Sequence, residues 1–241
     1  MAPLTSLTPA IDTSAADWIV GSLRDFAMSV VSLVPAGFPA YVRVFHPAYR
    51  GVGSKRTPVR WAEIAAAGEK RAHAGMQLPA LTGSFEALHH PQPGVFDRPP
   101  VEGSLPPELA AVLPAALAAH TSTPDRCWFA VWDGFGALRA DVRSAPTFTV
   151  PQREYHLLEG PMHAVAETVL DAPSQSPNLW WPDDRAWCVA TEIDLNTTYI
   201  GCSADCCAEI VALPEVEALP VEPAYGITLR SDLLNSIGKA G

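Results

Sequence analysis

Apolar residues recur with two different periods along this chain, and the two periods predict both helices and strands. A spacing of three and four residues makes one apolar stripe in residues 15–33, formed by Ile19, Leu23, Phe26, Val30 and Leu33. Apolar stripes and capping residues predict further helices over residues 58–73, 107–120, 160–170 and 203–213. The predicted helices are therefore spread along the whole chain.

Short runs of β-branched and aromatic residues lie between these helices and predict strands. They cover residues 40–45, 126–132, 137–142, 147–150, 154–158, 188–193 and 198–201. The turn at residues 133–136, Asp-Gly-Phe-Gly, predicts a hairpin between the second and third of these runs. The pattern indicates an α+β fold, with a mostly antiparallel sheet built from residues 126–158 and 188–201 and with helices packed on one face.

The length of 241 residues favours a single domain. We expect a flexible N-terminus over residues 1–14, one α+β domain over residues 15–220 and a loosely held tail over residues 221–241. The 24 prolines predict short elements joined by rigid loops. The longest irregular stretch, residues 75–107, is either a functional lid or a mobile loop.

The charge balance disfavours several classes of partner. The chain has 26 acidic and 16 basic residues, a net charge of −10, and no lysine or arginine run that would neutralise phosphates. We therefore expect neither nucleic acid nor membrane as a partner. The sequence shows no signal-peptide pattern and no apolar run long enough for a membrane span. An odd number of cysteines, five, then favours reduced thiols in the cytoplasm.

Three cysteines gather at the start of the last predicted helix. Cys202, Cys206 and Cys207 lie where a helix dipole favours a thiolate. Zinc needs four ligands, and no CxxC or HxxxH pair accompanies them. We expect these side chains to be packed in the core, with a reactive thiol or a metal or redox site as the alternatives. The sequence predicts no metal and no cofactor.

Two adjacent tryptophans are the leading candidates for a binding surface. Trp180 and Trp181 lie in a predicted polar loop beside Asp183, Asp184 and Arg185. Large aromatic residues flanked by charged ones are typical of protein interfaces. The alternative is that both rings fold back over the core, because tryptophan is highly buried on average.

Two acidic residues near the end of a predicted strand are the candidates for catalysis. Glu192 and Asp194 are two positions apart and so share one face of a strand, as paired carboxylates for acid and base chemistry would. Together with Arg43, His46 and Tyr49 they would line a small-molecule pocket. The alternative is a solvated acidic edge. The sequence contains no GxSxG, P-loop, HExxH or GxGxxG motif.

Three blocks of sequence resemble a family of uncharacterised actinobacterial proteins. The blocks are HTSTPDRCWFAVWDGFG at 120–136, YHLLEGPM at 155–162 and SPNLWWPDDRAWCVATEIDLNTTYIG at 176–201. The resemblance covers most of residues 15–220 and implies a bacterial source and a cytoplasmic location, but no activity. In that family the residues after Gly201 are usually glycine and aliphatic, so the three cysteines depart from its pattern. Helices leading into a small antiparallel sheet with Trp and Gly turns also resemble Smi1/Knr4-like domains.

These observations favour a non-enzymatic interaction domain with a protein partner. Its predicted contact surface is formed by Trp180, Trp181, Asp183 and Arg185. The alternative is a small-molecule enzyme that uses Glu192 or Asp194 as a base beside His46. A structural subunit of a larger assembly is the third hypothesis, because residues 75–107 form a long proline-rich connection.

Overall fold

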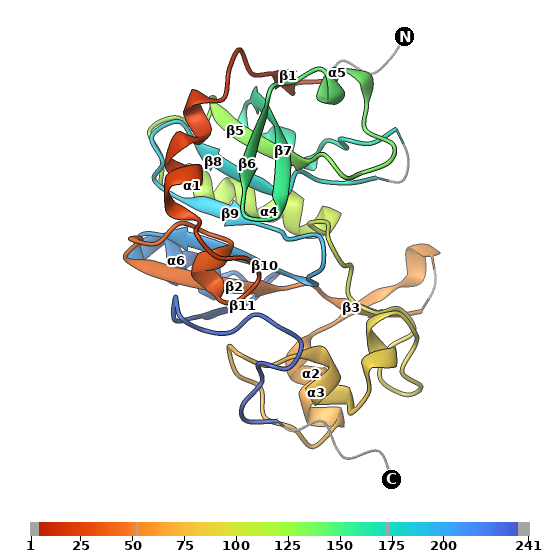
Figure 1. The fold of residues 1–241 in the computed structure, drawn as a ribbon. Helices are drawn as coiled ribbons and strands as arrows, with labels where there is room; N and C mark the ends of the chain where they lie inside the picture. The colour runs from red at the N-terminus through yellow and green to blue at the C-terminus, as the bar shows by residue number, and fades with distance from the viewer. Residues whose placement is uncertain (1–4, 52, 172–173, 236–241) are drawn as a thin grey trace.

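The computed structural model describes residues 5–51, 53–171 and 174–235 and confirms the α+β class. One nine-stranded sheet dominates the fold, and all strand pairings in these residues are antiparallel (Figure 1). Its strands lie in the order β1 (Thr8–Pro9), β7 (Arg153–Gly160), β5 (Cys127–Trp132), β8 (Leu179–Pro182), β9 (Cys188–Ala190), β10 (Thr197–Cys202), β2 (Ala40–Phe45) and β11 (Glu217–Pro220). A further strand, β6 (Thr147–Val150), pairs with β7.

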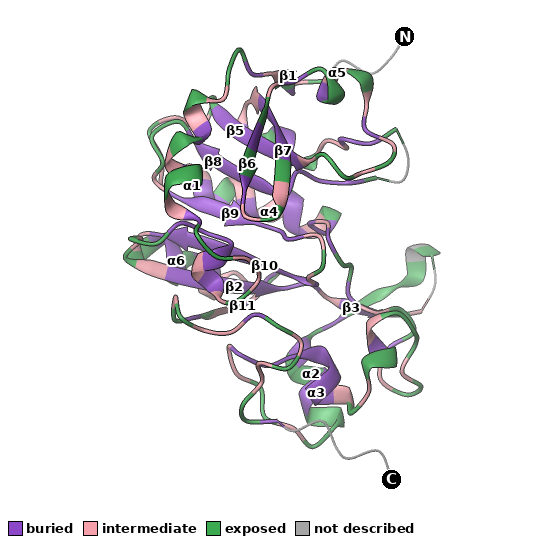
Figure 2. Ribbon diagram, viewed as in Figure 1, coloured by how far each residue is buried: buried purple, intermediate pink, exposed green. Residues whose placement is uncertain are grey.

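The two longest helices pack on one face of the sheet, as predicted. Helices α4 (Pro107–Ala118) and α6 (Ala204–Ala212), with the 3₁₀ helix η5 (Met162–Ala166), bury Leu113 and Ile210 against Phe129, Trp180 and Ile200. The opposite face is covered by shorter N-terminal elements, η1 (Ser14–Ala16), α1 (Asp17–Ser22) and η2 (Val30–Ser32). Successive strand residues alternate between these two apolar clusters, and the strands are therefore buried on both sides (Figure 2).

A small lobe extends from the end of β2. It contains the β3 (Ala48–Arg50) and β4 (Thr57–Val59) pair, α2 (Trp61–Ala67), α3 (Leu78–Thr82), and the 3₁₀ helices η3 (Gly53–Lys55) and η4 (Phe85–Leu88). Trp61, Met76 and Phe96 form its own apolar cluster. Much of the stretch predicted to be irregular, residues 75–107, is thus packed structure.

The first predicted helix is much shorter than the apolar stripe suggested. α1 ends at Ser22, and Leu23 adopts an extended backbone. The Ser32 hydroxyl accepts hydrogen bonds from the backbone N–H groups of Met28 and Ser29, and such local bonds compete with a continuous helix. The predicted helix over residues 58–73 is likewise wrong at its start, because Thr57–Val59 pairs with β3.

The predicted hairpin between residues 126–132 and 137–142 does not form. β5 instead pairs with β7 and β8, which offer longer ladders, and the chain after Trp132 enters the short helix α5 (Ala140–Arg143). Of the helix predicted over residues 160–170, only η5 is present. β8 takes the place of the polar loop that the sequence suggested around the tryptophan pair.

The packed fold extends beyond residues 15–220 at both ends. Leu7 is buried and β1 pairs with β7, whereas residues 1–14 were expected to be flexible. Val221, Ile227 and Asn235 are also buried, which corrects the prediction of a loose tail as far as residue 235. The predictions for residues 1–4 and 236–241 lie outside the described residues. No helix in the described part of the chain is long and apolar enough to cross a membrane.

Candidate functional site

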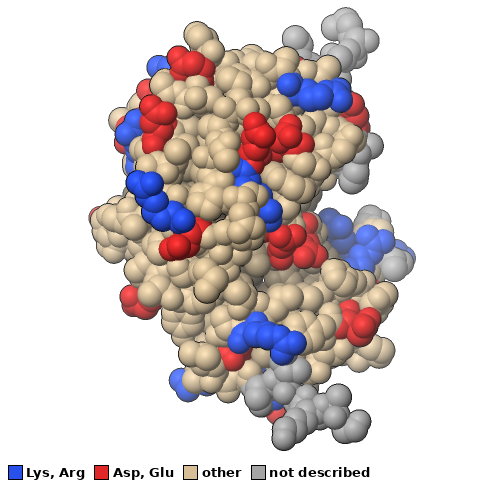
Figure 3. Space-filling model, in the orientation of Figure 1, with Lys and Arg blue, Asp and Glu red and all other residues tan. Residues whose placement is uncertain are grey.

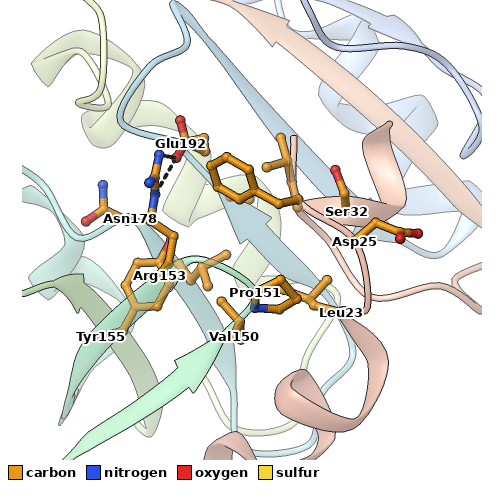
Figure 4. Close-up of a pocket in the computed structure, with 13 residues that line it drawn as sticks. Leu23, Asp25, Ser32, Val150, Pro151, Arg153, Tyr155, Asn178 and Glu192 are labelled. Atoms are coloured by element: carbon orange, nitrogen blue, oxygen red, sulfur yellow. Dashed lines mark hydrogen bonds and ion pairs between the residues drawn. The ribbon is translucent and has the colours of Figure 1, made fainter. Parts of the chain in front are cut away.

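The ends of three strands bring polar side chains together at one edge of the sheet. β7 and β8 both run antiparallel to β5, and β9 runs antiparallel to β8, so β7 and β8 begin where β9 ends. Arg153 is the first residue of β7, Asn178 directly precedes β8, and Glu192 follows β9. All three line a narrow pocket whose opposite wall is the N-terminal segment around Leu23 and Leu33 (Figure 4).

Arg153 and Glu192 form the charged centre of this pocket. The Nε and Nη2 groups of Arg153 donate to Glu192 Oε1 over 3.0 and 2.8 Å, and Nη2 also donates to Asp194 Oδ2 over 2.9 Å. The guanidinium lies 4.6 Å from the ring centre of Phe26 and 5.4 Å from that of Trp132. These contacts tie the N-terminal segment to the sheet.

Glu192 is not placed to act as a general base. Its Oε1 accepts both bonds from Arg153, and its Oε2 accepts the backbone N–H of Asp194 over 2.6 Å. Three of the roughly four lone-pair sites of this carboxylate are therefore already used within the fold. Asp194 is 72% exposed and lies outside the pocket wall. The geometry therefore supports a structural clamp rather than the predicted acid and base pair.

His46 lies on the other side of the sheet from Glu192. Thr198, its partner, shares a face with Ile200 in the helix-covered cluster, whereas Arg153 shares a face with Leu157 in the opposite cluster. The His46 ring is fully buried, donates from Nδ1 to the Val101 carbonyl over 2.7 Å and accepts at Nε2 from the Thr198 hydroxyl over 2.9 Å. The predicted pocket that combined these residues is wrong.

The remaining two residues of that predicted pocket also lie elsewhere. Arg43 is 2% exposed and donates to backbone carbonyls of the small lobe. Tyr49 is buried in β3, where Arg56 stacks on its ring.

Burial lowers the pKa of His46 to about 4, so this imidazole is neutral near neutral pH.

Tyr155 is the group that the sequence did not indicate. It follows Arg153 by two positions on β7 and so faces the same pocket. Burial, with the nearby charge of Glu192, raises the pKa of Tyr155, and among the described residues its hydroxyl makes no hydrogen bond. A hydroxyl at a pocket wall is able to bind one small polar group.

The tryptophan pair does not form a surface. Trp180 and Trp181 are both 0% exposed and project to opposite faces of β8. Trp180 packs against Trp187 with 4.9 Å between ring centres, and Trp181 packs against Trp18 with 6.2 Å. The alternative interpretation of the sequence, that both rings fold back over the core, is confirmed. The prediction of a contact surface at these two rings is wrong.

The two acids beside them stabilise neighbouring turns. Asp183 Oδ1 accepts the Trp128 indole N–H over 2.9 Å. Asp184 accepts from the Thr121 hydroxyl and from the backbone and side chain of Ser122, over 2.7 to 2.8 Å. Both carboxylates thus already have partners within the fold.

Arg185 is exposed, as predicted for a contact residue, but its aromatic neighbour is Trp18. The guanidinium lies 5.6 Å from the Trp18 ring centre. Arg185 also has a positive φ of 58° in the turn between β8 and β9, which is uncommon for a residue with a side chain. Phe38 packs edge-on against Trp18 at 6.3 Å. We call Trp18, Phe38 and Arg185 the aromatic ledge.

Two shallow hollows meet at Phe38. One is lined by Trp18, Gly37 and Arg185, and the other by Tyr41, Tyr225 and the proline-rich stretch 220–223. The Trp18 indole N–H is shielded from water and has no acceptor among the described residues. A sequence signal does exist, because Trp18 is not one of the residues that form the apolar stripe of residues 15–33.

The cysteines are packed side chains, as predicted. Cys202, Cys206 and Cys207 are at most 6% exposed, and all five cysteines are free. Ser203 accepts the backbone N–H of Cys206 and caps α6 as expected. No group of three or more His, Cys, Asp or Glu side chains within the described ranges is arranged to hold a metal ion.

Comparison with protein-family models, curated proteins and solved structures gives no match to this chain. The assignment of function therefore depends on the geometry alone.

Proposed function

We propose that this chain is a non-enzymatic domain that binds a protein partner through the aromatic ledge. The observation that carries the proposal is the exposed Arg185 stacked on a half-buried Trp18, which Phe38 contacts edge-on. Tryptophan and arginine dominate the residues that contribute most to binding at protein interfaces. A carboxylate of the partner would pair with Arg185, and apolar atoms of the partner would pack on the exposed part of the Trp18 ring.

The surroundings of the ledge favour a protein over a highly charged ligand. The adjoining hollow is built from aromatic and proline residues, Phe38, Tyr41 and Tyr225 among them. On the face drawn in Figure 3, acidic and basic side chains are interspersed with broad uncharged areas. Protein interfaces combine such apolar surface with a charged rim.

Site-specific photocrosslinking in the cells that produce the protein tests the proposal. A photoreactive amino acid at Ala36, an exposed residue that lines the same hollow, is compared with one at Arg143, an exposed arginine of α5 far from the ledge along the chain. We expect one defined crosslinked protein from position 36 only, and its binding to be weakened at least about tenfold by Arg185→Glu. Equal crosslinking at both positions would refute the ledge as the contact surface.

A second function, small-molecule binding in the pocket of Arg153, is favoured by the Tyr155 hydroxyl, which has no hydrogen-bond partner in the described part of the chain. Native mass spectrometry of the protein from its own cells tests it. A bound molecule that is retained by the wild type and lost in Tyr155→Phe supports this function. Identical spectra for the two proteins would remove it.

The cellular context remains part of the same proposal. All five cysteines are free and buried, which suits the reducing cytoplasm predicted from the sequence. The resemblance to actinobacterial proteins stays a prediction and contributes no activity.

A further inference from the structure

The C-terminal segment lies against the small lobe and is held by polar contacts. We call residues 228–235 the C-terminal strap; it runs down beside the lobe that carries α2 and α3 (Figure 1). Its apolar Leu233 and Leu234 are 90% and 56% exposed, whereas Asn235 is 5% exposed and the Asp232 side chain 1%. The strap thus buries an aspartate and an asparagine and exposes the two leucines between them, so polar contacts rather than the hydrophobic effect hold this part of it.

Two donors of the small lobe bind the Asp232 carboxylate. His73 Nε2 lies 3.0 Å from Oδ1, and the Gln77 backbone N–H donates to Oδ2 over 3.2 Å. His73 Nδ1 accepts the Gly75 N–H over 3.2 Å, which places the ring proton on Nε2 and makes that nitrogen the donor to Asp232. Gln77 Nε2 also donates to the neighbouring Ser231 hydroxyl over 3.2 Å.

The amide of Asn235 is bound just as specifically. Its Oδ1 accepts the backbone N–H of Arg71 over 3.0 Å, and its Nδ2 donates to the Arg71 carbonyl over 2.9 Å. A carboxylate would be repelled by that carbonyl, and an aliphatic side chain would leave both backbone groups without a partner. The small lobe therefore recognises an aspartate and, three residues later, an asparagine.

The receptor groups are positioned by contacts that do not involve the strap. Arg43 donates from Nη1 to the carbonyls of Ala74 and Met76, over 2.9 and 2.8 Å, and so fixes the loop that carries His73 and Gln77. Arg43 is buried, and no carboxylate of the described residues is bonded to it. Burial lowers the pKa of Arg43, and the nearby charge of Asp232 opposes that effect. A buried cation at the floor of the site favours an anionic occupant.

We propose that Arg71, His73 and Gln77 form a recognition site for an Asp-x-x-Asn segment of a protein partner, which the C-terminal strap occupies as an intramolecular pseudo-ligand. This inference rests on the proposed function in one respect, namely that the chain recognises a protein. An intramolecular occupant acts at an effective concentration in the millimolar range, so the strap keeps weaker peptides out. Because the strap buries little apolar surface, its local release costs far less than global unfolding.

Fluorescence anisotropy with a labelled peptide of residues 228–235, TLRSDLLN, tests the inference. The probe protein is the full chain with Asp232→Ala and Asn235→Ala, in which the strap has lost both anchors. We expect this variant to bind the peptide at least about tenfold more tightly than the wild type does, and to lose about tenfold in affinity when the peptide aspartate is alanine. Leu233→Ser with Leu234→Ser is the matched control and should bind no better than the wild type.

A folded variant that binds neither peptide would overturn the site. If the variant does not fold, hydrogen exchange is measured on the wild type instead. Excess TLRSDLLN peptide should displace the strap and speed deuterium uptake at residues 231–235. Unchanged uptake would refute the site as well. A dimer of the wild type held by exchanged straps, detected as a concentration-dependent mass, would contradict intramolecular occupancy. Arg185→Glu should leave peptide binding unchanged, which separates this result from the fate of the aromatic ledge.

Discussion

Arg153 and Glu192, 39 positions apart in the sequence, form a two-contact ion pair at the start of β7 and the end of β9. The side chains are 14% and 7% exposed, so water screens the pair only weakly. Phe26 and Trp132 lie within 4.6 and 5.4 Å of the guanidinium, measured to the ring centres. The pair therefore joins the sheet edge to the N-terminal segment that covers it.

Breaking this pair from the arginine side should be costly. Arg153→Leu leaves the Glu192 carboxylate buried without its partner, and we expect the free energy of unfolding to fall by about 2–4 kcal/mol. Asp194→Asn removes an exposed contact of the same guanidinium and should cost less than about 1 kcal/mol. Chemical denaturation measures both. Arg153→Leu combined with Glu192→Gln should recover part of the loss, and strict additivity of the two changes would contradict the pairing.

The stability of the fold should decrease with acid partly through His46. Its pKa falls from 6.5 to about 4 on folding because the ring is buried. The unfolded state therefore binds the proton first, and the stabilisation is complete above about pH 6.5 and is lost as the pH falls towards 4, at about 1.4 kcal/mol per pH unit.

His46→Asn removes that titration. We expect the variant to be less stable than the wild type near neutral pH, by about 1–3 kcal/mol, because the Thr198 hydroxyl or the Val101 carbonyl loses its partner. Its stability should also depend less steeply on pH between about 6 and 4. Urea denaturation across this range compares the two proteins. Parallel pH profiles would show that His46 does not titrate on unfolding.

The turn between β6 and β7 contains a residue that is better replaced by glycine. Val150 pairs with Arg153, so Pro151 and Gln152 form a two-residue loop, and Gln152 has a φ of 58°. Proline followed by a positive φ is the pattern of a type II turn, which favours glycine at the second position. Gln152→Gly should raise the free energy of unfolding by about 0.5–1 kcal/mol. Thr149→Gly, in the exposed part of β6, should lower it by a similar amount, and the same sign for both changes would refute the argument.

The native thiols should be inert. All five are buried, and burial raises the pKa of Cys127 to about 12. A disulfide reagent at about pH 8 should label none of them quickly in the native state and all of them after denaturation. The Cys202 side chain lowers the pKa of its neighbour Cys206, so any slow labelling of the native protein should begin at that thiol. Rapid native labelling of Cys127 would show that its burial is not maintained.

The regular features of the fold could be predicted from local patterns. The strand at residues 40–45, the helix from Pro107 and the cap at Ser203 follow from residue type and spacing, and the structure contains all of them. The prediction of a hairpin after Trp132 was wrong because β5 pairs with a strand distant in the sequence, β7, over all six of its residues. The prediction of one long first helix was wrong because the Ser32 hydroxyl accepts a backbone N–H, that of Met28, that a continuous helix would use itself.

The candidate sites were less predictable, because side-chain environment depends on contacts distant in sequence. Trp180 and Trp181 lie beside charged residues in the sequence but inside the sheet in space. Glu192 follows β9 and His46 follows β2, with β10 between these strands, and the two side chains face opposite sides of the sheet. The sequence predicted Arg185 as a contact residue, and its side chain is exposed. That Trp18 lies beside it follows only from the structure.

The sequence by itself determined that this is an α+β protein with an antiparallel sheet, packed cysteines and no motif of a common enzyme class. Periodicity and capping are local properties, so they are readable from one chain. Only the tertiary structure decided which side chains remain accessible and which distant groups meet, as Arg153 meets Glu192 and Asp232 meets His73. The reason is that pairing across the fold depends on the position of every strand, and no local pattern records it.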